Sequence, residues 1–420
     1  MENVVENVKG VAADDSSAGI ALCAAIAASD PGGIDSPLPQ ERNFHALGRI
    51  PHVFWHPLQA SIWLSELVFG IVSLLLLLAV AATIPGLNLI ALGYVLYAEG
   101  QVARSGKLRD GLPLVPAAAR LGSVVLGACL WLAPIWYLAD LARDAQLIAP
   151  SSSSSRWQWA ILVAAASVVA VHLVLAVARG GRFDRFLWPV GNVLWLRRQL
   201  RRGGFGDSAE RSLRRFVDDL RLPHLAWLGL CGFVGTAVWL AVPSLLFALP
   251  LDPSIIWQRW LAVIGAGGLV VVLAWAPLIQ VQFAARERFR ALFDLGAVRT
   301  MFRQAPLRWV LAISLLYASA IPMFLWSGRL KMMVQSHREI LDLTLISLAT
   351  TFPARVLLGW VYSRAVQRAP SPLIWSWAMR LLLAALLAGY VYLLFLSSLT
   401  AELGRHWFNE HHALLLPIPW

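Results

Sequence analysis

Three ionisable side chains lie in apolar runs long enough to cross a membrane. Arg355 lies in the middle of LISLATTFPARVLLGWVY, two residues after Pro353, while Glu66 and His172 lie in two earlier runs. A charged side chain near the centre of a bilayer costs about 2.5–3.5 kcal/mol on insertion scales, so it usually faces a partner, water or a ligand. Three candidate partners for Arg355 can be named from the sequence. They are Glu66, His172 and the backbone carbonyl that Pro353 leaves without its helical hydrogen bond.

These residues allow two interpretations. In the first, Arg355 binds an anionic ligand or gates a transport path, and Glu66 and His172 line the same path. In the second, Arg355 is a structural tie or extends its guanidinium to the membrane surface, and the other two are packing residues.

A second group of candidate ligands lies near the C-terminus, in GRHWFNEHHALLLPIPW. His406 and Glu410 would share a face of a helix, and His411 follows directly. Neutral imidazoles and a carboxylate suit Zn²⁺. No HExxH motif and no fourth fixed ligand accompanies them, so a polar tail is the alternative and no cofactor is expected.

A strongly basic loop at 179–221 contains eleven arginines and five acidic residues. Basic segments beside a membrane span attract anionic lipid headgroups. The candidates for this contact are Arg197, Arg198, Arg201, Arg202, Arg214 and Arg215. The net charge of +11 does not favour a nucleic-acid partner, because loops on the cytoplasmic side collect Arg and Lys in any membrane protein.

Composition predicts the fold class that must position these residues. The chain has 420 residues, of which 58% are hydrophobic and 14% charged. Soluble domains have about 45–50% apolar and about 25% charged residues. Only helices or closed barrels cross a bilayer, and these runs are unbroken rather than alternating. We therefore predict an all-α, polytopic transmembrane helical bundle.

About eight spans fit the hydropathy, and the loops between them alternate between basic and near-neutral. By the positive-inside rule the basic loops are cytoplasmic, which places both termini outside. The alternative makes 85–99 a ninth span and puts the N-terminus inside. The predicted spans are 62–84, 118–139, 157–178, 223–250, 257–282, 307–327, 341–361 and 375–398.

We divide the chain into four parts: a mobile N-terminal tail at 1–60, a first membrane half at 61–250, a second half at 251–400 and a C-terminal tail at 401–420. The spacing of Trp and Pro suggests that the halves form a parallel repeat of four plus four spans. The residues with matching spacing are Trp63, Pro85 and Pro134 in one half, and Trp257, Pro277 and Pro322 in the other.

The repeat would pair 85–117 with 278–306, a segment too basic to span. Its apolar positions could form one stripe of an amphipathic helix at the cytoplasmic interface: Phe283, Phe289, Leu292, Phe293 and Val298. By analogy, we expect 85–105 to leave the first span at a kink at Pro85-Gly86 and to lie at the same surface.

One stretch, GYVLYAEGQVARSGKLRDGLP, resembles a bacterial multipass membrane family known only as a domain of unknown function, number four thousand and thirteen. The matching residues are Gly93-Tyr94, Gly106 and Leu112-Pro113. An acidic cluster expected after Leu-Pro is replaced by LVPAAARLG. The resemblance implies a multipass membrane fold and no activity.

The sequence contains no GxSxG, Walker or CxxC motif, so it predicts no catalytic residue and favours a non-enzyme. We expect a multipass protein of a bacterial inner membrane that acts as a scaffold or as a transport-associated subunit. Its partners would be the bilayer, anionic headgroups and another membrane protein. The alternatives are a transporter or channel with Arg355 in its path, and a membrane enzyme that acts on lipid.

Overall fold

The computed structural model describes residues 57–150, 152–202, 210, 214, 217–248, 255–331 and 337–393. The predicted tails at 1–60 and 401–420 lie outside these residues, except that 57–60 begin the first described helix. In the described part every regular element is a helix. The α-helices are α2 (Pro57–Thr83), α3 (Leu87–Ser105), α4 (Val115–Ile148), α5 (Ser153–Ala178), α6 (Phe183–Leu187), α7 (Pro189–Arg202), α9 (Leu222–Ala248), α10 (Ile256–Arg286), α11 (Leu295–Gln304), α12 (Pro306–Lys331), α13 (His337–Ala365) and α14 (Leu373–Val391); the 3₁₀ helices are η1 (Leu108–Gly111) and η2 (Phe289–Phe293).

Seven of the described helices are long and apolar enough to cross a membrane. The number rises to eight if α11 and the start of α12, which meet at 107°, are counted as one broken span. Each of the eight predicted spans coincides with one long helix: α2, α4, α5, α9, α10, α12, α13 or α14. The prediction of an all-α multipass membrane protein is therefore confirmed.

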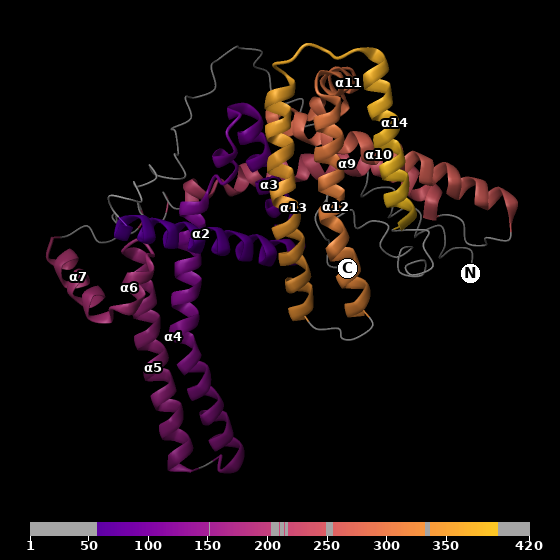
Figure 1. Ribbon diagram of the computed structural model, residues 1–420. Coiled ribbons are helices and arrows are strands. Elements are labelled where there is room, and N and C mark those ends of the chain that lie inside the picture. Colours follow the sequence, from indigo (N-terminus) through magenta and orange to yellow (C-terminus); the bar gives the residue numbers. More distant parts are fainter. Residues whose placement is uncertain are drawn as a thin grey trace.

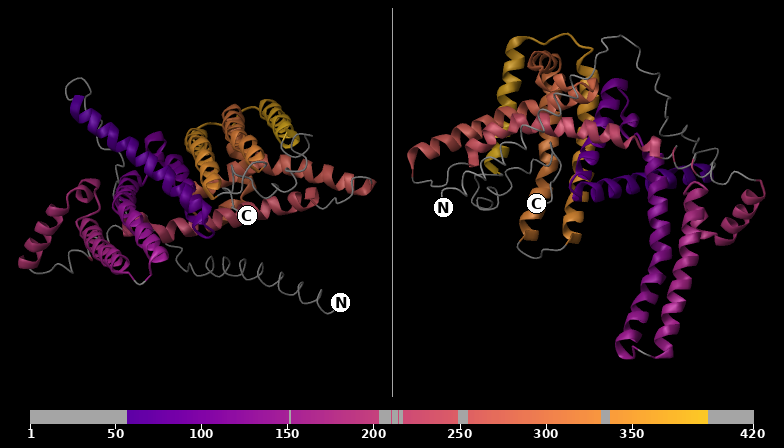
Figure 2. Two further views of the ribbon diagram at one scale, coloured as in Figure 1. Left: turned by 90° about the horizontal axis from the view of Figure 1, so that it is seen from below. Right: turned by 180° about the vertical axis from the view of Figure 1, so that it is seen from behind.

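The helices form two regions, shown in Figures 1 and 2. We call α3, α9, α10, α12, α13 and α14 the bundle; α9 and α10 run side by side across α12, α13 and α14. The hairpin of α4 and α5, which we call the arm, extends away from the bundle (Figure 1). Helix α2 joins the two regions, because it contacts both α4 and α13.

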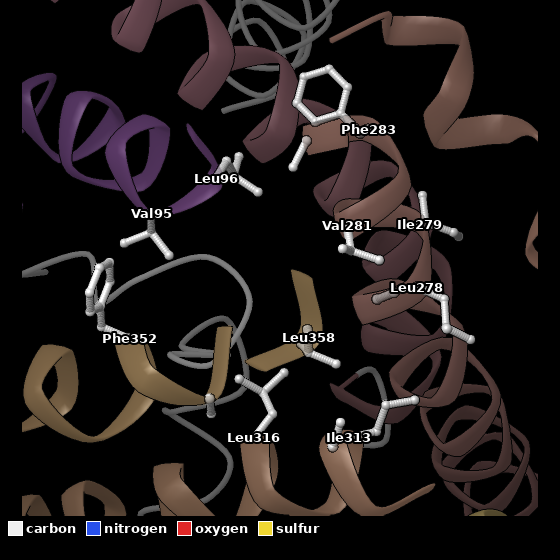
Figure 3. Packing of buried hydrophobic residues seen from close by; sticks show 14 of the residues in the cluster. Val95, Leu96, Leu278, Ile279, Val281, Phe283, Ile313, Leu316, Phe352 and Leu358 are labelled. Atoms are coloured by element: carbon white, nitrogen blue, oxygen red, sulfur yellow. The ribbon is translucent and has the colours of Figure 1, made fainter. Parts of the chain in front are cut away.

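Helix α3 is the most deeply enclosed element of the bundle. Every residue from Ala91 to Gly100 is buried, so the helix has no exposed face over almost three turns. It contacts α2, α9, α10 and α13. Figure 3 shows side chains of this core, among them Val95, Leu96, Phe283 and Phe352.

The predicted surface position of 85–105 is therefore wrong. The break at Pro85-Gly86 is present, and Gly86 has the positive φ of 85° that a residue without a Cβ tolerates. After the break the chain enters the bundle instead of lying on it. An interfacial helix must present an apolar stripe to lipid and a polar stripe to water, and α3 presents neither.

Glycines permit this enclosure by letting backbones touch. A Cβ on Gly93 would lie 1.8 Å from the Leu225 carbonyl oxygen of α9, and one on Gly229 would lie 1.8 Å from that of Leu89. A Cβ on Gly100 would lie 2.1 Å from the Ala284 carbonyl oxygen of α10. Small residues at helix crossings are how membrane helices gain close van der Waals contact.

The sequence predicts one amphipathic helix over 278–306, and this prediction is wrong. Residues 278–286 continue α10, η2 follows, and α11 is a separate short helix. Of the predicted stripe, Phe283, Leu292 and Val298 are buried in the protein core, whereas Phe293 is 43% exposed. Helix α10 ends at Arg286, and the next residue, Glu287, has a left-handed backbone conformation. The later positions of the predicted stripe therefore do not lie on the same helix as Phe283.

The two segments that the predicted repeat pairs, 85–117 and 278–306, share one short structural pattern. Helices α3 and α10 both end in a left-handed residue, Gly106 and Glu287, followed by an extended residue and a 3₁₀ helix. The helices themselves differ, because α10 runs unbroken through Pro277 whereas the chain breaks at Pro85-Gly86.

Candidate functional site

The most unusual polar feature of the bundle is a buried ion pair between α3 and α13. Arg355 Nη1 donates to Glu99 Oε2 at 3.1 Å. The side chains are 2% and 0% exposed, respectively, and the residues are 256 positions apart in the chain. A buried charge needs an opposite charge and hydrogen bonds to be tolerated in a medium of low dielectric constant.

Close helix packing positions the pair. A Cβ on Gly359, one turn after Arg355, would lie 2.3 Å from the Glu99 carbonyl oxygen, so the two backbones touch at this level. One turn before Arg355, Phe352 stacks on Tyr94 of α3 with ring centroids 6.0 Å apart. These two contacts fix the register of α13 along α3.

The pair does not satisfy all of its polar atoms. Glu99 Oε1 is buried and has no hydrogen-bond partner, and the same holds for the Tyr94 hydroxyl about one turn earlier on α3. An unsatisfied buried acceptor destabilises a fold by about 1–3 kcal/mol, so it is seldom retained without a reason.

Arg355 ends a line of buried polar residues along α13. Thr344, Ser347, Thr351 and Arg355 are each no more than 3% exposed. Their spacing of three or four residues puts them on one face of the helix. A second buried polar contact joins two other helices of the bundle, where Gln280 Nε2 of α10 donates to Thr236 Oγ1 of α9 at 2.7 Å.

Four hollows of the described residues do not reach the pair. Four hollows of about 420, 570, 610 and 750 Å³ are lined by other residues than Glu99 and Arg355. The one of about 570 Å³ adjoins α13 at Pro353, Ala354 and Val356, and its lining is largely apolar. Arg355 is therefore packed against protein rather than against one of these openings.

The structure does not bring Glu66 to Arg355. Glu66 is exposed on α2 and lines the hollow of about 750 Å³ together with Arg120 and Arg182. This hollow lies between α2, the start of α4 and α6, at the base of the arm.

His172 lies in the arm, where it has structural contacts. Its Nε2 is 3.0 Å from the Phe186 carbonyl oxygen, and its Nδ1 is 3.3 Å from Asn192 Nδ2. Trp131 Nε1 donates to the same Phe186 oxygen at 2.8 Å. Asn192, which is fully buried, also donates to the Arg185 carbonyl at 2.8 Å. His172 thus helps to hold α6 and α7 against the arm.

The arginines predicted to meet anionic lipid are mostly exposed. Arg197, Arg198 and Arg201 project from α7, and Arg214 pairs with Glu210 at 2.7 Å. The side chain of Arg202 and all of Arg215 lie outside the described structure.

The metal candidates His406, Glu410 and His411 also lie outside it. Within the described residues, no group of three or more His, Cys, Asp or Glu side chains is arranged to hold a metal ion.

Two central residues, Glu99 and Gln280, were missed by the sequence reasoning. Glu99 was missed because its segment was assigned to the membrane surface, where an acid needs no explanation. The sequence around Glu99 did carry a signal. Glu99 directly precedes Gly100, and Gly100 follows Gly93 by seven residues. An acid beside glycines in an apolar run is typical of a tight, buried helix crossing.

No family model, no curated protein and no solved structure matches the chain. The resemblance of residues 93–113 to a multipass family therefore stays a prediction.

Proposed function

We propose that the chain is a membrane-embedded scaffold of a bacterial inner membrane, or a transport-associated subunit, rather than a conducting protein. The observation that carries this proposal is the packed state of Arg355, which is 2% exposed and paired with Glu99. A residue that lines a solute path must be reachable from water in at least one state. A tight ion pair between two helices instead serves to fix how they are assembled.

The shape of the chain supports the scaffold proposal. The arm contacts the rest of the chain chiefly through α2, α6 and α7. Its outer side chains are far more exposed than those of the bundle core, with Trp136 at 72% and Tyr137 at 67%. We propose the arm as the surface for a second membrane protein, because aromatic side chains supply large contact areas at interfaces.

Photocrosslinking in intact membranes tests the scaffold proposal. A photoreactive amino acid replaces Tyr137 of the arm in one variant and Leu315 of the bundle, 49% exposed, in a matched control. We expect one discrete protein adduct from position 137 and only lipid adducts from position 315. Lipid adducts alone at both positions would remove the support for a partner on the arm.

A transporter is the second candidate, and the line of buried polar residues on α13 favours it. Thr344, Ser347 and Thr351 lead along one helix face to Arg355 and to the unsatisfied Glu99 Oε1. Such a line is the kind of route that protons or small ions follow between helices.

Proteoliposomes distinguish the two candidates. Proton flux is followed with a pH-sensitive dye and chloride flux with a chloride-sensitive dye. The scaffold proposal expects the wild-type protein and Arg355→Leu to leak no faster than empty liposomes. Flux through the wild-type protein that disappears in a folded Arg355→Leu variant would establish the transporter and overturn the scaffold.

A further inference from the structure

A hollow at the base of the arm has the chemistry of a phospholipid site. Its volume is about 750 Å³, and it lies between α2, the first turns of α4 and the segment that follows α5. One part of its lining is apolar, with Trp63, Leu67, Phe69 and Leu126, and another part carries Arg120 and Arg182. The hollow is separate from the Glu99–Arg355 pair.

Arginines gather at the polar end of this hollow. Burial lowers the pKa of the Arg185 guanidinium below its usual value, and three other arginines act in the same direction against the opposing effect of Asp184. Those three are Arg120, Arg179 and Arg182. The lining itself carries Arg120, Arg182, Glu66 and Asp184, and Arg182 pairs with Asp184 at 3.3 Å. Arg179 and Arg185 do not line the hollow but lie close enough to act on the same charges, so the neighbourhood of the hollow has four guanidinium groups and two carboxylates.

The backbone holds these arginines in place. Gly180 and Gly181 have positive φ values of 106° and 65°, which turn the chain sharply after α5. A Cβ on Gly180 would lie 2.7 Å from Arg185 Nη1, so the guanidinium folds over the glycine. Phe186, fully buried, anchors α6 against the arm through its carbonyl oxygen, which is contacted by Trp131 and His172.

We propose that this hollow binds an anionic phospholipid. The phosphate lies between Arg120 and Arg182, because guanidinium groups bind phosphate oxygens through paired, charge-assisted hydrogen bonds. The acyl chains lie along the apolar wall formed by Phe69 and Leu126. Basic pockets between membrane helices bind such headgroups, and the arginines of this hollow come from the start of α4 and from the basic segment after α5.

Native mass spectrometry of the full chain in detergent micelles tests the proposal. The probes are dioleoyl phosphatidylglycerol and dioleoyl phosphatidylcholine, which have the same acyl chains and differ in headgroup charge. The test variant is Arg120→Gln with Arg182→Gln. Its matched control is Arg143→Gln with Arg156→Gln, which removes the same charge from the exposed opposite end of the arm.

We expect the wild-type protein and the control to retain phosphatidylglycerol in preference to phosphatidylcholine. The test variant should retain it about tenfold less, as expected for the loss of a charge-assisted contact. If the double variant does not fold, the single variant Arg182→Gln is used in its place. Its side chain is 64% exposed, so the substitution should not disturb folding.

A second pair of variants tests the apolar wall. Leu126→Trp fills the hollow and should reduce phosphatidylglycerol retention, whereas Leu130→Trp, one turn farther along α4, should not. Equal retention of the two lipids by the wild-type protein would overturn the proposal. So would equal losses in the test variants and their controls, or displacement of the lipid by inorganic phosphate, which would indicate a site for a free anion.

Discussion

The bundle around α3 and the arm of α4 and α5 are both made of apolar helices, yet they are packed in opposite ways. In α3, ten consecutive residues from Ala91 to Gly100 are buried. In α4, which is almost twice as long, only five residues are buried: Val115, Ala118, Ser123, Gly127 and Ala142. Apolar character therefore does not distinguish a helix enclosed by its own chain from a helix whose side chains are mostly exposed.

Backbone contact at glycines does make this distinction. Gly93 and Gly100 bring α3 within backbone contact of α9 and α10, and Glu99 between them pairs with Arg355. In the arm, the atoms nearest to a Cβ on Gly127 would be those of the Phe186 side chain rather than of a backbone. Lipid is as apolar as leucine, so close packing and buried polar contacts must supply what the hydrophobic effect does not.

Among the substitutions that test this contrast, Gly93→Leu should cause the largest loss of stability. The α3 and α9 backbones would have to separate, because even a Cβ lies 1.8 Å from the Leu225 oxygen. We expect a loss of more than about 4 kcal/mol, or no folded protein, as for other severe core clashes. The measurement is unfolding in detergent mixed with SDS, followed by circular dichroism.

The control for this change is Ala133→Leu on the exposed face of α4. It adds the same side chain in the arm, and we expect a change within about 0.5 kcal/mol, as for most exposed positions. Equal effects of the two substitutions would show that close backbone contact is not what separates the bundle from the arm.

The next largest effect is expected for Arg355→Leu, which leaves Glu99 as an unpaired buried carboxylate. Breaking a buried ion pair in this way typically destabilises a protein by about 3–5 kcal/mol. The same change at Arg143 of the arm, whose side chain is 71% exposed, should have a small effect. Both are measured by the same SDS unfolding assay.

The double variant Glu99→Leu with Arg355→Leu sharpens this prediction. Replacing both charges by apolar groups removes the desolvation penalty, so we expect it to be more stable than Arg355→Leu alone. A double variant less stable than the single variant would mean that Glu99 stabilises the bundle through contacts other than Arg355.

The smallest expected difference in stability is between the same substitution at two tyrosines, one in the bundle and one in the arm. The Tyr317 hydroxyl in the bundle donates to the Leu273 carbonyl at 2.7 Å, whereas Tyr137 in the arm is 67% exposed. Tyr317→Phe should destabilise the protein by about 1 kcal/mol, the net value of a buried hydrogen bond. We expect Tyr137→Phe to leave the SDS midpoint unchanged; a larger shift for Tyr137→Phe would contradict the contrast.

The sequence was sufficient to predict the long helices. Each apolar run of more than eighteen residues became a helix, because backbone hydrogen bonding in lipid leaves few other choices. The break at Pro85-Gly86 was also predictable, since proline lacks an amide donor and glycine accepts a positive φ. These are local properties, and they are encoded within a few residues.

The enclosure of α3 was not predictable in the same way. The segment is short and ends in Arg104, which suggested a helix at the membrane surface. In the structure Arg104 instead donates to the Ala284 carbonyl at 3.0 Å and pairs with Glu287 at 2.9 Å, at the end of α10. Its partners lie about 180 residues away, so no local pattern reveals them.

The partner of Arg355 was missed for the same reason. Glu66 and His172 are the candidate partners because they lie inside predicted spans, but Glu66 is exposed beside the base of the arm and His172 is held within the arm. Its local sequence marks Glu99 as unusual, but its pairing with Arg355 could be recognised only by knowing that α3 and α13 touch at Gly359.

The distance in sequence between Glu99 and Arg355 has a consequence for how the protein is made. Ribosomes add about 5–20 residues per second, so the 256 residues between them take on the order of tens of seconds to synthesise. During that time α3 emerges with an acidic side chain and no counter-charge, which disfavours its release into lipid. Its place in the bundle is complete only when α9, α10 and α13 have been synthesised, so the first half of the chain completes its packing after the second half has been made.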